Sequence, residues 1–200
     1  MICAYLLVKA VCPTVDVDPE VLANLPPVPG RMEEVSANVF VDYAHATQSL
    51  KGALKFLRKA KRLDQPQSGR LFVVFGCGGD RDKGKRRQMG QVASELADVV
   101  LVTDDNPRSE APEAIRREIL TAAPGALEFP DRRAAIAYAL TNRHPEDVVL
   151  LAGKGHEKTM IYGDTVIPFN DADTCVRVRV CVSDSVTEIL SRLFGILKII

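Results

Sequence analysis

The stretch "RLFVVFGCGGDRDKGKR", residues 70–86, changes abruptly from apolar side chains to glycines and charges. Leu71 to Phe75 lack polar alternation, which is typical of a strand buried on both faces of a parallel sheet. Gly76, Gly78 and Gly79 follow, and glycines let backbone N–H groups approach a ligand closely. The lysines and arginines that come next suit phosphate or carboxylate groups. This stretch therefore predicts a buried strand that ends in a candidate binding turn.

The same pattern recurs in "NVFVDYAH" (38–45), "DVVLVTDDN" (98–106) and "EDVVLLAGKGHE" (146–157). Amphipathic segments with apolar residues at helical spacing lie between these runs, and Thr47 is expected to cap the first of them. The residues of the four helical patterns are Leu50, Ala53, Leu54, Leu57; Met89, Val92, Ala93, Leu96; Ile115, Ile119 after Pro112; and Ile136, Ala139, Leu140 after Asp131. Alternation of strands and helices predicts an α/β fold: a Rossmann-like open, mostly parallel, doubly wound sheet with flanking helices.

Polar residues follow each predicted strand, and ligands of such sheets bind beyond the carboxyl ends of the strands. Four segments are therefore candidates as one site: Asp42 to His45, Gly76 to Arg81, Asp104 to Arg108, and Gly153 to Glu157. Each segment alone also fits an ordinary turn, since Asp, Asn, Pro and Gly are common turn residues. The glycine turn matches neither GxGxxG nor GxxxxGK[ST], so nucleotide binding does not follow from its pattern.

The side chains in these turns suit an amino-acid head group. Arg108 can grip a carboxylate with two parallel hydrogen bonds, and Asn106 can both donate and accept. Glu157 can bind an ammonium group, whereas His156 can carry a proton or serve only as a scaffold. No Ser–His–Asp arrangement is legible, so we predict no catalytic residue in this chain.

Composition excludes several classes of function. The 26 basic and 26 acidic residues cancel, so no global charge attracts nucleic acid or an anionic membrane. The apolar run at the N-terminus is cut by Pro13 and Asp16, far short of a membrane span. The five cysteines form no CxxC pair, and no histidine stands at zinc-ligand spacing, which predicts reduced thiols, no metal site and a cytoplasmic protein.

Taken together and in order, "PVPGRMEEV", "VDYAHATQSL", "FGCGGDRDKGKR", "TDDNPRSE" and "AGKGHE" resemble the C-terminal domain of the Mur ligase family. The resemblance runs from about Val21 to Asp171 and is closest to the branch that adds meso-diaminopimelate to UDP-N-acetylmuramoyl-L-alanyl-D-glutamate. It implies an ATP-dependent amide ligation in peptidoglycan synthesis. ATP would phosphorylate the D-glutamate γ-carboxylate, and the amine of diaminopimelate would attack the acyl phosphate.

The resemblance also implies roles for individual residues. Carried over onto the matching positions, the residues that would hold the distal carboxylate and amine of meso-diaminopimelate are Arg81, Asn106, Arg108, Gly153 and Glu157. Lysine lacks that distal carboxylate and would leave Arg108 without its anion. The residues expected to face ATP are Arg31, Asp42 and His45, while Mg²⁺ ligands are expected mainly from a central ATPase domain.

The sequence departs from the family in two ways. No GxxxxGK[ST] phosphate loop occurs, so we expect residues 1–30 to be a remnant of the central ATPase domain and linker, and residues 31–175 the C-terminal domain. Residues 176–200 form an atypical tail, with strand-like alternation from Val176 to Val182 and an apolar helical pattern after Ser185. We expect the chain to be inactive without separate ATPase and UDP-binding domains.

Two alternatives stay open at this point. The chain could be a non-catalytic binding module that retains recognition of diaminopimelate or a nucleotide, which the missing phosphate loop favours. It could also be a related ligase similar to folylpolyglutamate synthases, against which the "DNPR" stretch at 105–108 argues.

Overall fold

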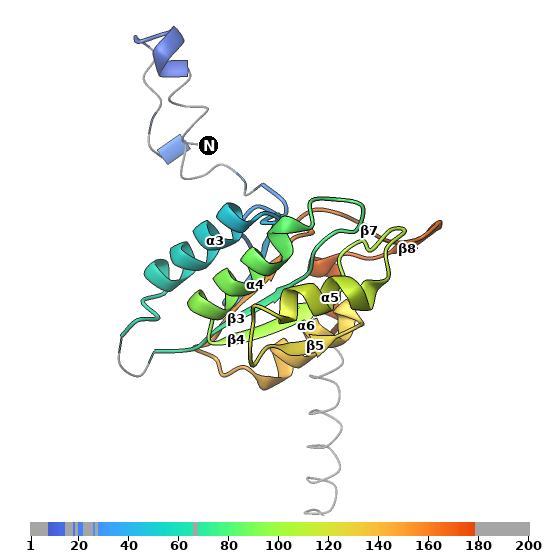
Figure 1. Cartoon of the computed structure of the whole chain (residues 1–200). Helices are drawn as coiled ribbons and strands as arrows, with labels where there is room; N and C mark the ends of the chain where they lie inside the picture. The colour runs from blue at the N-terminus through green and yellow to red at the C-terminus, as the bar shows by residue number, and fades with distance from the viewer. Residues whose placement is uncertain are drawn as a thin grey trace, which may run out of the picture.

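The computed structural model describes residues 8–14, 18, 20, 21, 26, 28–65 and 68–178. Figure 1 shows a central sheet with helices layered on both faces. Its six strands are β1 (Glu33–Ser36), β2 (Val39–Asp42), β3 (Leu71–Phe75), β4 (Val99–Thr103), β5 (Leu127–Phe129) and β6 (Val148–Ala152). They lie in the order β1-β2-β6-β3-β4-β5, and only β1 pairs antiparallel. The predicted fold class is confirmed.

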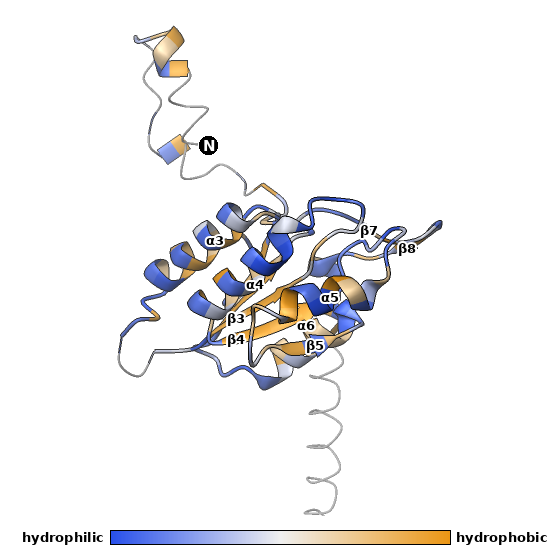
Figure 2. Cartoon of the chain, viewed as in Figure 1, coloured by the Kyte–Doolittle hydropathy of each residue, from blue (hydrophilic) through white to orange (hydrophobic). Residues whose placement is uncertain are grey.

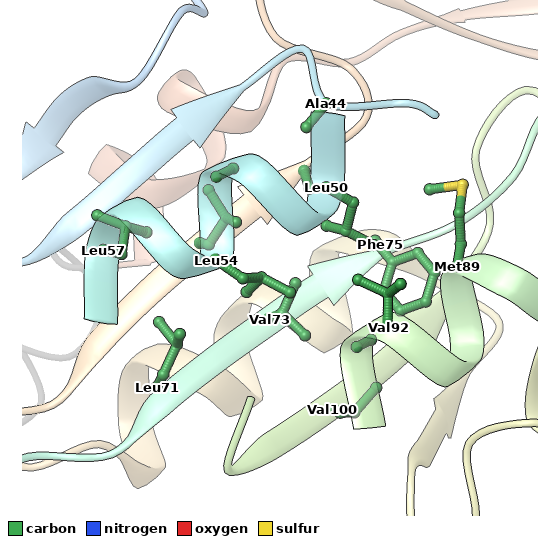
Figure 3. Close-up of a cluster of buried hydrophobic side chains, with 14 of the residues drawn as sticks. Ala44, Leu50, Leu54, Leu57, Leu71, Val73, Phe75, Met89, Val92 and Val100 are labelled. Atoms are coloured by element: carbon green, nitrogen blue, oxygen red, sulfur yellow. The ribbon is translucent and has the colours of Figure 1, made fainter. Parts of the chain in front are cut away.

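Helices cover the two faces of the sheet unequally. One face packs against α3 (Thr47–Ala60), α4 (Gly84–Leu96) and α5 (Pro112–Leu120), and the other against α6 (Arg132–Asn142) and the helical residues 171–178. Side chains of β3 alternate between these two cores, with Val73 and Phe75 in the first and Phe72 and Val74 in the second. Figure 3 shows the first core, where α3, α4 and β3 interdigitate. The strands therefore need apolar residues at every position.

The hydropathy of the helices agrees with this layering. In Figure 2 the central strands β3 and β4 are orange, whereas the helices carry patches of blue. Pro112 occupies the first turn of α5, and the Asp131 carboxylate accepts a hydrogen bond from the Arg133 N–H at 3.0 Å as the cap of α6. The expectation that Thr47 caps α3 is wrong by one residue. The cap is Ala46, whose N–H donates to Ser49 Oγ at 3.1 Å.

The chain reverses direction across the sheet between β5 and β6. It proceeds from β3 to β4 and β5 with α4 and α5 on one face, then returns through α6 on the other face to place β6 between β2 and β3. The carboxyl ends of β2, β6, β3 and β4 consequently meet at one edge. Crevices at such reversals are the usual binding sites of open α/β sheets.

A two-stranded hairpin, β7 (Thr159–Tyr162) and β8 (Thr165–Pro168), follows β6 and was not expected from the sequence. The strand-like pattern expected from Val176 is wrong for residues 176–178, which are helical. The remainder of that tail, with its expected helix, lies outside the described residues. Among the described residues, no helix has the length and apolar character needed to span a membrane.

Candidate functional site

A pocket of about 360 Å³ opens at the carboxyl edge of the sheet. Its lining residues are Tyr43, His45, Ala46, Gly78, Arg81, Asp82, Lys85, Asp105, Asn106, Arg108, Gly153 and Glu157. All five residues expected to hold an amino acid line this pocket, and so does His45. Arg31 and Asp42 do not line it. The fold thus brings turns after β2, β3, β4 and β6 to one place.

The turn after β4 has an unusual backbone. Asn106 and Arg108 have φ angles of 45° and 53°, which lie in the left-handed region. This conformation costs a non-glycine residue about 1–3 kcal/mol. The β7–β8 hairpin holds this conformation, because the Arg108 N–H donates to the Ile161 carbonyl at 3.1 Å and the Gly163 N–H donates to the Arg108 carbonyl at 2.7 Å. The hairpin therefore sets the direction of the Arg108 side chain.

The Arg108 guanidinium is only partly used within the protein. Its Nη1 donates to the carbonyl oxygens of Gly79 at 3.0 Å and Asn106 at 3.3 Å. Within residues 28–65 and 68–178 the guanidinium forms no ion pair with a carboxylate, which leaves Nε and Nη2 for a ligand. Gly78 makes room for it, since a Cβ there would lie 2.9 Å from Nη1.

Asn106 and Glu157, which line the same pocket, form a connected cluster with the buried Lys154. Asn106 Nδ2 donates to Glu157 Oε2 at 2.8 Å, and Lys154 Nζ donates to the same oxygen at 2.9 Å. Burial raises the pKa of Glu157, but the hydrogen bond and charge of Lys154 and the Asn106 amide outweigh it and lower that pKa overall. Glu157 is therefore an ionised carboxylate at neutral pH.

Asp104 points away from this cluster. Its carboxylate pairs with the buried Arg116 and accepts a hydrogen bond from the Tyr162 hydroxyl at 3.1 Å. Burial raises the pKa of Asp104, and the contacts with Arg116 and Tyr162 reduce that effect. Of the adjacent acids 104 and 105, only Asp105 lines the pocket.

Glu110 joins the glycine turn to the turn after β4, and sequence reasoning missed it. Its carboxylate accepts from the Asp80 N–H at 2.7 Å and pairs with Arg86 at 2.9 Å and Lys83 at 3.1 Å. The hydrogen bond from Arg86 is the main cause that lowers the pKa of Glu110 to about 2. Glu110 therefore fixes the turn that carries the exposed Arg81 next to Asp80.

The three residues expected to face ATP gather around Tyr43, although only His45 lines the pocket. The Arg31 guanidinium lies 4.4 Å above the Tyr43 ring, and the His45 ring lies 4.5 Å from it. The Asp42 carboxylate accepts a hydrogen bond from the Met32 N–H at 2.7 Å, so it orders the segment that carries Arg31.

Tyr43 and Lys85 are pocket residues that sequence reasoning did not single out, although both stand inside the quoted motifs. Lys85 Nζ donates to the His45 carbonyl at 2.6 Å, which ties α4 to the turn after β2. The signal for Tyr43 was its place in the turn after β2, and the signal for Lys85 was its place among the basic residues that follow the glycines. Among the described residues, no group of three or more His, Cys, Asp and Glu residues is placed to hold a metal ion.

The fold and pocket define an α/β domain with an amino-acid-sized polar site at its carboxyl edge. Comparison with protein families agrees with this description, because the model "Mur ligase, glutamate ligase domain" matches residues 30–155. The chain belongs to the Mur ligase family. The UDP-N-acetylmuramoyl-L-alanyl-D-glutamate--2,6-diaminopimelate ligase of Brucella melitensis is 51% identical over 155 residues, which cover 75% of this chain and 30% of that protein. The chain thus spans about a third of the length of the curated relatives it matches.

Solved structures agree with the fold. A structure of a UDP-N-acetylmuramoyl-L-alanyl-D-glutamate--2,6-diaminopimelate ligase aligns with a TM-score of 0.67 and 34% identity over 86% of this chain and 36% of that chain. The bifunctional folylpolyglutamate synthase/dihydrofolate synthase of Yersinia pestis, complexed with AMPPNP and Mn ion, aligns with a TM-score of 0.56. Its identity is 20%, over 74% of this chain and 34% of that chain, so this likeness shows the fold alone.

Proposed function

We propose that this chain is the amino-acid-binding, C-terminal part of an ATP-dependent ligase that adds meso-diaminopimelate to UDP-N-acetylmuramoyl-L-alanyl-D-glutamate. The name of the Brucella melitensis relative supports this substrate, and so does the identity of 51% over the region that contains the pocket. The reaction belongs to peptidoglycan synthesis and would use ATP and a UDP-linked precursor, so a cytoplasmic location is part of this proposal.

The observation that carries the proposal is that the pocket contains a hydrogen-bond donor of positive charge and an acceptor of negative charge that are not fully used within the protein. On one side, Arg108 retains guanidinium N–H groups for a carboxylate. On the other side, Glu157 is ionised and has one oxygen without a donor among the described residues. A carboxylate and an ammonium on one carbon satisfy both sides. Diaminopimelate has such a head group at each end, whereas lysine has only an ammonium at its far end.

The part of the reaction that falls to this chain is positioning. With its distal head group held by Arg108, Asn106 and Glu157, diaminopimelate would present its other amine towards the acyl phosphate of the D-glutamate side chain. Fixing that amine in an attacking position replaces a bimolecular encounter by an effectively unimolecular step. Arg81 is exposed in the same pocket, where it can bind a carboxylate. Gly153 lines the pocket next to Asp105.

ATP and a divalent metal ion complete the proposed reaction. Arg31, exposed above Tyr43, and His45 are the residues of this chain that would face the nucleotide, while Asp42 holds their segment in place. The given sequence has no GxxxxGK[ST] loop, so ATPase and UDP-binding domains outside this sequence are proposed to supply the phosphate loop and the metal ligands. We expect no ligation by this chain alone.

Calorimetric titration of the purified chain with meso-diaminopimelate and with lysine tests the proposal. We expect binding of diaminopimelate to exceed that of lysine by at least about tenfold, because a charge-assisted hydrogen bond contributes roughly 1.5–3 kcal/mol. Arg108→Ala should remove this preference, and Arg87→Ala, an exposed arginine of α4 that does not line the pocket, should retain it. Equal affinity for the two amino acids, or no binding of either, contradicts the proposed pocket.

One observation favours a second candidate, a binding module without ligase activity. All residues that line the amino-acid pocket lie within this one domain, so binding of a ligand by itself requires no phosphate loop. Release of phosphate from ATP distinguishes the two candidates. Phosphate release after addition of the relative's N-terminal and central domains supports the ligase. Diaminopimelate binding with no phosphate release in the same mixture supports the binding module.

A further inference from the structure

Lys154 is a fully buried lysine in the turn between β6 and β7. Its ammonium lies 2.9 Å from Glu157 Oε2, 3.3 Å from Asn106 Oδ1 and 3.6 Å from Asp105 Oδ1. Lys154 does not line the pocket, although all three of its partners do. Burying an ammonium is strongly unfavourable unless its hydrogens are paired, so these three contacts determine the geometry around it.

The first consequence concerns the orientation of the Asn106 amide. An ammonium can only donate, and the backbone N–H of Ile161 also only donates, at 3.0 Å. Both face the same side-chain atom of Asn106, which must therefore be the oxygen. The amide nitrogen is forced to the opposite side, where one hydrogen is used on Glu157 and the second remains for an acceptor in the pocket.

The second consequence concerns Glu157. Its Oε2 accepts two hydrogen bonds, from Lys154 and from Asn106, whereas no residue of the described chain donates to Oε1. The carboxylate is thus anchored through one oxygen and offers the other to a donor. The cations that face Glu157 are Lys154, Arg108 and Arg132, and Asp105 is the carboxylate that shares Lys154 with it.

We propose that Lys154 is a positioning residue that sets the donor and acceptor polarity of the pocket. It orients one free N–H of Asn106 and one free oxygen of Glu157 toward the same head group, without touching the ligand itself. This inference rests on the proposed function and deepens it: recognition of a carboxylate beside an ammonium depends on a cation beneath the pocket. Without that cation, the Asn106 oxygen keeps only the Ile161 N–H as a donor, so the amide is held less firmly, and Glu157 loses its main counter-charge.

A purely structural role would look different, and the neighbouring buried pair shows how. Arg132 and Asp171 are both fully buried and are joined by two contacts of 2.8 Å, while Arg132 Nη2 donates to the Ala152 carbonyl at 2.9 Å. These bonds attach the helical residues 171–178 to the end of β6. They involve no side chain that lines the pocket, whereas every side-chain partner of Lys154 does.

The test replaces Lys154 by methionine, which has similar length and no charge, and uses Lys158→Met as the control. Lys158 is an exposed lysine on the same turn, so its substitution removes the same charge. We expect Lys154→Met to weaken diaminopimelate binding by about 10-fold to 100-fold in calorimetry and Lys158→Met to change it less than about 2-fold. Lys154→Gln, which keeps a donor without a charge, should lose less affinity than Lys154→Met.

Nuclear magnetic resonance of the ligand-free chain gives a readout that does not need the ligand. In Lys154→Met, the Asn106 side-chain amide signals should shift or broaden, and the Glu157 carboxyl should titrate at higher pH than in the wild type. Both signals should be unchanged in Lys158→Met. If Lys154→Met does not fold, the same measurements are made on Lys154→Gln.

The outcomes separate this inference from the proposed function. Failure of the wild-type chain to bind diaminopimelate refutes the proposed function, yet the resonance signals still decide whether Lys154 orients Asn106 and Glu157. Wild-type affinity in Lys154→Met, or unaltered Asn106 and Glu157 signals in it, overturns the inference.

Discussion

The two ends of the same sheet use carboxylates in opposite ways. At the amino end, Asp147 accepts hydrogen bonds from the Arg70 N–H at 2.6 Å, from the His144 N–H at 2.9 Å and from the Arg70 guanidinium at 2.8 Å. At the carboxyl end, Glu157 keeps one oxygen without a donor among the described residues. A saturated carboxylate stabilises the fold, and one with unused capacity can bind a ligand.

Asp98 repeats the saturated pattern at the amino end. Its two oxygens accept from the Leu71 N–H at 2.7 Å and from Arg58 at 2.8 Å, which fixes the starts of β3 and β4. At the other end, the Arg108 guanidinium donates to two carbonyl oxygens and pairs with no carboxylate of the residues that the structure describes. Among these four side chains, hydrogen bonding separates Asp147 and Asp98, whose oxygens all have donors, from Glu157 and Arg108, which keep groups for a ligand.

The largest expected effect on stability comes from removing a fully hydrogen-bonded carboxylate at the amino end of the sheet. Asp147→Ala should lower the free energy of unfolding by about 2 kcal/mol, because it leaves two partly buried backbone N–H groups without acceptors and Arg70 without its partner. The affinity for diaminopimelate should not change, since Asp147 lies at the opposite end of the sheet. Urea denaturation followed by circular dichroism, with calorimetry of the folded variant, measures both quantities. A loss below about 1 kcal/mol contradicts the structural role.

A glycine comparison gives the next effect. Gly153 and Gly125 both have positive φ, at 111° and 85°, so alanine at either position should cost roughly 1–2 kcal/mol of stability. A Cβ at Gly153 would also lie 2.6 Å from Asp105 Oδ2, whereas a Cβ at Gly125 meets nothing within 4 Å. Only Gly153→Ala should weaken diaminopimelate binding, by about tenfold. Equal affinities of the two variants would show that the pocket tolerates a displaced Asp105.

Acid should weaken the amino end in a defined direction. Burial raises the pKa of Asp147, but hydrogen bonds from Arg70 and His144 outweigh burial and lower that pKa overall. Its stabilising effect is therefore full above the unfolded value of about 3.9 and is lost as the pH falls through the folded value. The stability advantage of the wild type over Asp147→Asn should be constant from pH 7 to 5 and shrink below about pH 4. An advantage that grows on acidification would reverse this assignment.

The smallest effect sharpens the contrast between saturated and solvated carboxylates. Asp64 pairs with Arg58 at 3.2 Å, but its side chain is 74% exposed. Asp64→Ala should change the free energy of unfolding by less than about 0.5 kcal/mol, since exposed ion pairs contribute little. The same urea titration used for Asp147→Ala measures it. A loss as large as that of Asp147→Ala would show that the ion pair, rather than the saturated backbone contacts, stabilises this end.

Much of the fold was legible in the sequence because it depends on local patterns. The run Leu71 to Phe75 predicted a strand buried on both faces, and the structure divides its side chains between two cores. Pro112 and Asp131 predicted the starts of α5 and α6 for reasons of backbone chemistry that act within one turn. The prediction failed at Thr47 by one residue. It also failed at residues 176–178, because a helix that begins at residue 171 continues through them and overrides the strand propensity of the valines.

The sequence by itself determined which turns carry polar groups and that these turns share one edge, since parallel strands with apolar runs must align their carboxyl ends. Only the tertiary structure decided which polar groups are satisfied. The Asn106–Glu157 bond joins residues 51 positions apart, and the hairpin that directs Arg108 pairs with it through the backbone. Hydrogen-bond partners separated so far along the chain leave no periodic trace in the sequence, because each depends on the packed arrangement of all the elements between them.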